Sequence, residues 1–126
     1  MRLLLDTAAL IYAVEAPERL SKKAAGMVRD PENTLELSAV SLVEIAIKSS
    51  GGKLRLEAAT VQRAIEELGV RVLPFTASVA FALFNLPVLH RDPFDRQIIS
   101  QALLEDIPVL TSDQMFKRYK GLRVIW

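Results

Sequence analysis

Cysteine is absent from the 126-residue chain, and histidine occurs once, as His90. Without cysteine the chain has no disulfide, no thiolate nucleophile, no zinc knuckle and no iron–sulfur ligation. A single histidine excludes a two-histidine metal site within one chain, and any histidine-based catalytic triad would rest on His90 alone. The side chains that are left for chemistry are carboxylates, hydroxyls, lysines and arginines.

Long apolar runs and an excess of charge are also missing. The longest apolar runs, residues 8–14 and 79–84, are far shorter than the roughly 20 residues that a membrane-spanning helix needs. The leucines at positions 3–5 are interrupted by Asp6, unlike the core of a signal peptide. We therefore expect a cytoplasmic protein that binds no membrane. The net charge is only +1, so any binding of nucleic acid depends on local patches.

The residues that are present predict one folded α/β domain over residues 1–126. The apolar fraction of 51% and the charged fraction of 25% are typical of globular proteins, and no linker or repeat divides the chain. Short apolar runs alternate with helical patterns, which predicts a mostly parallel sheet flanked by helices. We expect strands at residues 2–5, 34–39, 70–75, 107–111 and 122–126. We expect helices at residues 7–14, 21–28, 41–50, 57–69, 78–86, from 92 onward, and 112–119.

Four carboxylates stand near the ends of these elements: Asp6, Glu44, Asp95 and Asp113. Each has a structural interpretation, because an acid at the start of a helix caps free N–H groups and meets the positive end of the helix dipole. Glu44 is the third residue after Ser41, so the two match a capping box that opens the helix there. Asp92, followed by Pro93, matches an N-cap with proline at the first helical position.

The four acids also have a functional interpretation as a set. Asp6, Glu44 and Asp113 each follow a predicted strand, and parallel strands end at one edge of the sheet, where ligands of such folds bind. Asp95 follows a predicted helix, so periodicity alone does not place it there. Clustered carboxylates repel one another unless cations lie between them, and oxygen ligands select hard ions such as Mg²⁺ or Mn²⁺. Such ions can clamp a phosphodiester and activate a water for attack.

Several segments together resemble the PIN-domain proteins, in particular the VapC-like toxins of type II toxin–antitoxin pairs. The similar segments occur in the same order over nearly the whole chain: LLLDT (3–7), SAVSLVEIAIK (38–48), GKL (52–54), HRDPFDR (90–96), VLTSD (109–113), Tyr119 and LRVIW (122–126). The resemblance implies a PIN-like three-layer fold with a central parallel sheet. It also implies a Mg²⁺- or Mn²⁺-dependent endoribonuclease that cleaves an RNA substrate, forms a homodimer and is inhibited by a cognate antitoxin.

Residue by residue, the resemblance makes Asp6, Glu44, Asp95 and Asp113 the catalytic, metal-binding acids. Thr7 and Thr111 match hydroxyl positions beside the first and last acids, where they can bind carboxylates or metal-bound waters. The sequence departs from the family pattern where histidine or tryptophan is frequent: Ala8, Ile11-Tyr12 and Val43 stand at those places. These departures leave the acids intact and bear on substrate preference.

Some alternatives stay open at the level of sequence. Asp92 is a helix cap or a fifth acid that tunes the site, and Arg96 contacts phosphate or pairs with Asp92. His90 is interpreted as structural and is not included in the site. Two basic groups either track an RNA backbone or form solvated surface: Lys48, Lys53 and Arg55, and Lys117, Arg118, Lys120 and Arg123. The rival to a nuclease is a catalytically inactive PIN-like module that acts by binding RNA or a protein partner.

Overall fold

A five-stranded parallel sheet forms the centre of the molecule. In the computed structural model, which describes residues 1–126, the strand order is β3-β2-β1-β4-β5 and every pairing is parallel. The strands are β1 (Arg2–Leu5), β2 (Thr34–Ser38), β3 (Arg71–Leu73), β4 (Val109–Leu110) and β5 (Val124–Ile125). The predicted α/β class with a parallel sheet is confirmed, although the last three strands are shorter than the sequence predicts.

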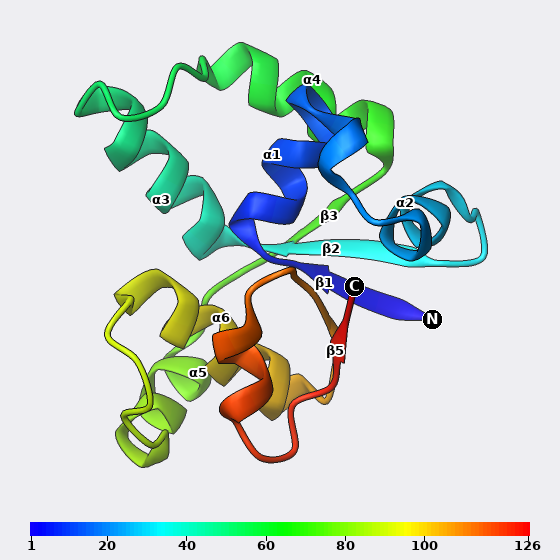
Figure 1. The fold of residues 1–126 in the computed structure, drawn as a ribbon. Coiled ribbons are helices and arrows are strands. Elements are labelled where there is room, and N and C mark those ends of the chain that lie inside the picture. Colours follow the sequence, from blue (N-terminus) through cyan, green and yellow to red (C-terminus); the bar gives the residue numbers. More distant parts are fainter.

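Six α-helices and three short 3₁₀ helices complete the fold. The α-helices are α1 (Thr7–Glu15), α2 (Lys22–Arg29), α3 (Ala39–Ser50), α4 (Ala58–Leu68), α5 (Ala77–Ala82) and α6 (Pro93–Glu105). The 3₁₀ helices are η1 (Pro17–Arg19), η2 (Leu83–Asn85) and η3 (Gln114–Arg118). Helices α1, α2 and α4 lie on one side of the sheet, and α5 and α6 lie on the other, so the fold has three layers (Figure 1). No helix has the length and apolar character needed to cross a membrane.

The leucine run of β1 supplies both faces of the core. Leu3 and Leu5 belong to the apolar cluster on the side of α1 and α4, whereas Leu4 belongs to the cluster that contains Ile98 and Ile99 of α6. All three leucines are fully buried. A central parallel strand that is covered on both faces needs apolar residues at every position, which explains a continuous run in place of alternation.

The start of α3 differs from the prediction. The helix begins at Ala39, and the cap is Ser38, whose hydroxyl accepts a hydrogen bond from the Val40 N–H at 3.2 Å. The predicted capping box at Ser41 is therefore wrong, because β2 passes into α3 without a loop. Ser41 is fully buried inside the helix, where its hydroxyl accepts a hydrogen bond from Thr7 at 2.9 Å. Glu44 consequently lies in the second turn of α3, away from the cap.

The predicted helix starts at Asp92 and near Asp113 are both found, but the second element is a 3₁₀ helix and not an α-helix. Asp92 caps α6, since its Oδ1 accepts the N–H groups of Phe94 and Asp95, each at 2.9 Å. Asp113 caps a short 3₁₀ helix, accepting the Met115 N–H at 2.9 Å, where the sequence predicts an α-helix over residues 112–119. Both aspartates thus stand at the first turn of an element, and Asp113 directly follows the β4 segment.

Candidate metal centre at the carboxyl edge of the sheet

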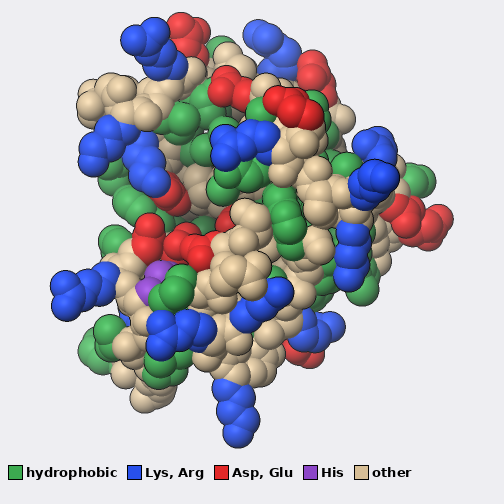
Figure 2. Space-filling view, in the orientation of Figure 1, with side chains coloured by type: hydrophobic (Ala, Val, Ile, Leu, Met, Phe, Trp, Pro, Cys, Tyr) green, Lys and Arg blue, Asp and Glu red, His purple; other side chains and the backbone are tan.

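The chain brings acids from four elements to the carboxyl edge of the sheet. Asp6 follows β1 and caps α1, Glu44 belongs to α3, Asp95 lies in the first turn of α6, and Asp113 follows β4 and caps η3. Figure 2 shows acidic side chains gathered where this face of the molecule is hollowed, next to the histidine. The hollow lies between the helix layers that Figure 1 shows above and below the sheet.

Asp6 is the most enclosed of these acids. Its side chain accepts hydrogen bonds from the Ala9 N–H at 2.7 Å and from the Thr111 hydroxyl at 2.5 Å. The pKa of Asp6 is nevertheless raised to about 6, chiefly by burial and also by the charges of Asp113 and Glu44, against the lowering effect of those hydrogen bonds. The two hydrogen bonds hold the carboxyl in place without compensating its burial.

Asp95 experiences the charge of every other acid in the hollow. Burial raises the pKa of Asp95 to about 7, and the next contributions are the charges of Asp92, Asp6, Glu44 and Asp113. The sequence does not place Asp95 with the other acids by periodicity, but the structure brings its carboxyl within their electrostatic reach. The four acids therefore form one coupled set, in which the charges of Glu44 and Asp113 raise the pKa of both Asp6 and Asp95.

Glu44 has one paired and one unpaired oxygen. Its Oε2 is ion-paired with Lys48, one turn further along α3, and this hydrogen bond raises the pKa of Lys48. Its Oε1 is buried and has no hydrogen-bond partner. A buried carboxylate oxygen without a partner is energetically costly, so the lone pairs of this atom are available to a hydrogen-bond donor or a cation.

The donor set fits a hard divalent cation. As the side chains are placed, no group of three or more His, Cys, Asp or Glu residues already forms a metal cage. Mg²⁺ does not require such a cage, because it binds one or two carboxylates and retains waters or substrate phosphate oxygens. The free Oε1 of Glu44 and the raised pKa values of Asp6 and Asp95 are both features that a bound cation would relieve.

The two threonines have different roles. Thr111 links the first and last acids, because its hydroxyl donates to Asp6 and accepts the Asp113 N–H at 3.0 Å. The predicted hydrogen bond from Thr111 to a carboxylate is thus confirmed. Thr7 donates to Ser41 and binds no carboxylate. Its contact ties α1 to α3 beside the site.

The structure also decides the open cases around α6. Arg96 donates to the carbonyl oxygens of Pro87 and Leu86, at 2.8 and 3.4 Å, and does not pair with Asp92; its contact with phosphate stays a prediction. Asp92 is a cap, and its charge also raises the pKa of Asp95. The two interpretations of Asp92 are therefore compatible.

His90, which the sequence predicts to be structural and outside the site, lies beside Asp95. Its side chain is only 10% exposed, and its Nε2 lies 3.6 Å from Asp95 Oδ2. Its Nδ1 lies 2.7 Å from the hydroxyl of Tyr119. Helical or strand periodicity gives no signal for this contact, because His90 is in an irregular segment before α6.

The fold and its acids define a class of protein: a parallel α/β domain with a coupled set of carboxylates at the carboxyl edge of the sheet. The model of the PIN domain family matches residues 3–122. The chain therefore belongs to the PIN domain family.

Solved structures of toxin–antitoxin proteins share this fold. VapBC2 from Rickettsia felis, bound to a DNA fragment from its promoter, contains a chain with 20% identity and a TM-score of 0.74, and the match covers 99% of this chain and 98% of that one. VapBC from Salmonella typhimurium, also bound to DNA, has 16% identity and a TM-score of 0.69, and the match covers 99% of this chain and 97% of that one. VapBC-1 from nontypeable Haemophilus influenzae has 21% identity and a TM-score of 0.62, with coverage of 99% of this chain and 97% of that one. No curated protein matches the chain.

Proposed function

We propose that this PIN-domain protein is a metal-dependent endoribonuclease, acting in the cytoplasm as the toxin of a type II toxin–antitoxin pair. The observation that carries this proposal is the coupling of Asp6, Glu44, Asp95 and Asp113 in one hollow at the edge of the sheet. A scaffold gains nothing from mutually repelling acids, whereas a cation site requires them. The toxin–antitoxin names of the similar structures support the biological role.

The catalytic roles follow from the placement of the acids. Asp6, Glu44, Asp95 and Asp113 would hold Mg²⁺ or Mn²⁺, which when bound activates water and neutralises charge on a phosphodiester. Thr111 fixes the Asp6 carboxyl through its 2.5 Å hydrogen bond. Lys48 holds Oε2 of Glu44, which leaves Oε1 as the oxygen without a hydrogen-bond partner.

RNA cleavage by the purified protein tests this proposal. We expect cleavage with Mg²⁺ or Mn²⁺, loss of cleavage with EDTA, and a loss of about 100-fold or more in Asp113→Asn. Glu66→Gln, a matched change of an exposed acid on α4, should cleave like the wild type. Cleavage that survives EDTA would contradict the mechanism. Binding of RNA without any cleavage would favour the inactive PIN-like module.

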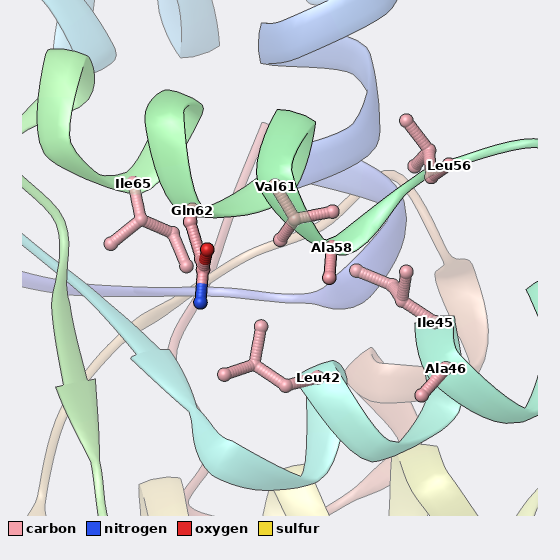
Figure 3. Close-up of a pocket in the computed structure, with 8 residues that line it drawn as sticks. All are labelled: Leu42, Ile45, Ala46, Leu56, Ala58, Val61, Gln62 and Ile65. Atoms are coloured by element: carbon pink, nitrogen blue, oxygen red, sulfur yellow. The ribbon is translucent and has the colours of Figure 1, made fainter.

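The antitoxin has a candidate binding surface between α3 and α4. An apolar pocket of about 210 Å³ opens between these helices. Figure 3 shows apolar side chains of both helices directed into this space, and its lining residues are Leu42, Ile45, Ala46, Leu56, Ala58, Val61, Gln62 and Ile65. An amphipathic helix of a partner buries its apolar face in a groove of this kind. The similar structures include a toxin–antitoxin complex and a member of the VapBC family of toxin–antitoxin systems, so we propose the cognate antitoxin as the occupant.

Antitoxin binding can be tested with the product of the neighbouring reading frame. Ala58→Asp places a charge in the groove and should weaken the complex by about 100-fold or more, because the carboxylate must be desolvated. Ala59→Asp, at the next position of α4, is the matched control, and Ala59 is exposed. Equal binding of both variants would exclude this groove as the antitoxin site.

A second surface supports the expected homodimer. The rings of Phe81 and Phe84 stack with their centroids 6.1 Å apart and are 69% and 84% exposed, and Val88, further along the chain, is 77% exposed. The same segment borders a pocket of about 290 Å³ lined by Leu86, Leu103 and Leu104, among others. A projecting aromatic pair next to an apolar pocket is self-complementary, as a two-fold interface requires. Phe84→Ser should shift the protein from dimer to monomer in sedimentation, whereas Val72→Thr on β3 should not.

A further inference from the structure

His90 is held in a buried aromatic setting beside the acid set. Its ring centroid lies 5.5 Å from that of Tyr119 and 6.4 Å from that of Phe116. Tyr119 is 2% exposed and Phe116 is fully buried, so the imidazole packs against a fixed wall of the core. The ring therefore has little freedom to rotate, and the directions of its two nitrogens are defined.

The two nitrogens face different partners. Nδ1 lies 2.7 Å from the Tyr119 hydroxyl, and Nε2 lies 3.6 Å from Asp95 Oδ2. Nε2 is buried and has no hydrogen-bond partner of its own. A neutral imidazole carries one N–H and one acceptor nitrogen, so the partner of one nitrogen decides the state of the other.

The surroundings favour one tautomer. When Asp95 is ionised, as cation binding requires, its carboxylate only accepts hydrogen bonds, so an unprotonated Nε2 facing it would set a lone pair against a negative oxygen. The Tyr119 hydroxyl can donate to Nδ1 and leave the proton on Nε2, directed at Asp95. In the reverse arrangement, the proton is on Nδ1 and is donated to the Tyr119 hydroxyl. The lone pair of Nε2 then faces the Asp95 carboxylate and repels it.

We propose that Tyr119 fixes His90 as the Nε2–H tautomer and that His90 thereby positions the Asp95 carboxylate for cation binding. His90 is a positioning residue, since it acts through Asp95 and not on the substrate. The part of this proposal that concerns the cation rests on the proposed function. Partners that orient a metal-binding side chain typically contribute about 10- to 100-fold to metal affinity.

The tautomer can be measured in the metal-free protein. His90 is the only histidine, so a ¹H–¹⁵N correlation spectrum of the imidazole contains one pair of ring nitrogens. At about pH 8.5, we expect a protonated Nε2 and an unprotonated, hydrogen-bonded Nδ1. Tyr119→Phe keeps the ring and should shift the Nδ1 resonance by removing its donor. A wild-type protein with the proton on Nδ1, or no change of Nδ1 in Tyr119→Phe, would overturn the proposal.

The positioning role can be measured as Mn²⁺ affinity by electron paramagnetic resonance. We expect His90→Ala to weaken Mn²⁺ binding by about 10-fold or more, and His90→Gln, whose amide N–H₂ can replace Nε2–H, to recover most of it. In RNA cleavage, His90→Ala should lower kcat and leave KM for RNA nearly unchanged. Thermal unfolding checks that each variant folds, and Tyr119→Phe serves as a second test if His90→Ala does not.

The outcomes separate the two proposals. Wild-type Mn²⁺ affinity in folded His90→Ala and Tyr119→Phe would overturn the positioning role while leaving the nuclease intact. A wild-type protein that binds no Mn²⁺ and cleaves no RNA would overturn the proposed function, and with it the role of His90 in cation binding. The imidazole spectrum decides the contact with Tyr119 in either case, because it requires neither metal nor RNA.

Discussion

Glu36 and Asp6 are both buried carboxylates, and their partners differ. Glu36 of β2 is fully buried but lies 3.0 Å from Arg2 and 3.6 Å from Arg71, so cations compensate its charge. Asp6 is 4% exposed and has only hydrogen bonds from Thr111 and a backbone N–H, with further acids around it. The charge of Glu36 is thus compensated by arginines, whereas no basic side chain pairs with Asp6.

The uncompensated charge of Asp6 should make the metal-free protein less stable as the pH rises. The folded-state pKa is raised from 3.8 to about 6, so the folded protein binds the proton more tightly than the unfolded chain. The stabilising contribution is fully present below 3.8 and is lost as the pH rises through about 6. Asp95 extends the same loss to about pH 7.

Asp6→Asn removes this pH-dependent cost. In EDTA, we expect the variant to exceed the wild type in free energy of unfolding by about 1–3 kcal/mol at about pH 7.5, and by much less at about pH 4.5. Asparagine can still accept the Ala9 N–H, so the cap of α1 is kept. Urea titrations at the two pH values measure the difference, with Glu66→Gln as the exposed control. A variant no more stable than the wild type at the higher pH would contradict the electrostatic coupling.

Glu36→Gln, the same loss of charge in the scaffold, should have the opposite sign. We expect the free energy of unfolding to fall by about 1–2 kcal/mol, because the hydrogen bonds from Arg2 lose their charge and Arg71 loses its partner. RNA cleavage should be unchanged under conditions in which the variant is folded. Urea titration measures the stability and a cleavage assay measures the activity. An increase in stability would show that the arginines do not compensate the buried charge of Glu36.

At the scale of elements, the sequence predicts what depends on local pattern. The leucine run of β1, the Asp92–Pro93 start of α6 and the end of α4 at Gly69, which adopts φ 65°, all have local signals and are found. The start of α3 does not, because Ser38 and Ser41 both suit an N-cap and only the direct passage from β2 selects Ser38. Asp95 and His90 come close to the other acids only through the way α6 packs against the rest of the fold, and no sequence periodicity encodes that packing.

The buried hydrogen bond between Thr7 of α1 and Ser41 of α3 provides a test of how these two helices are joined. Thr7→Val and Ser41→Ala should each lower the free energy of unfolding by about 1 kcal/mol, and the double variant should lose less than the sum because neither hydroxyl is left unpaired. Ser38→Ala should also cost about 1 kcal/mol through loss of the cap, but additively with Thr7→Val. A capping role for Ser41 would instead make the Thr7 and Ser41 changes additive.

At the scale of the molecule, the net charge of +1 is a balance and not an absence of charge. Acids gather in the hollow, and lysines and arginines spread over the surrounding surface (Figure 2). The proposed binding of RNA is compatible with a nearly neutral chain, provided that a cation first neutralises the acids and the surrounding basic side chains then contact phosphates. Binding of cation, loss of protons and gain of stability become linked, because the same carboxyls take part in all three.

That linkage predicts how Mg²⁺ changes the stability of the whole protein. A cation that binds only the folded state stabilises it by about 2.7 kcal/mol at 100 times its dissociation constant. The rise in Tm should be larger at about pH 7.5 than at about pH 5, because below the raised pKa values of Asp6 and Asp95 protons compete for the same oxygens. Asp6→Asn combined with Asp95→Asn should abolish the rise, and Glu66→Gln should keep it. Thermal unfolding with NaCl at matched ionic strength measures the effect, and an equal rise in wild type and double variant would mean that Mg²⁺ acts elsewhere on the surface.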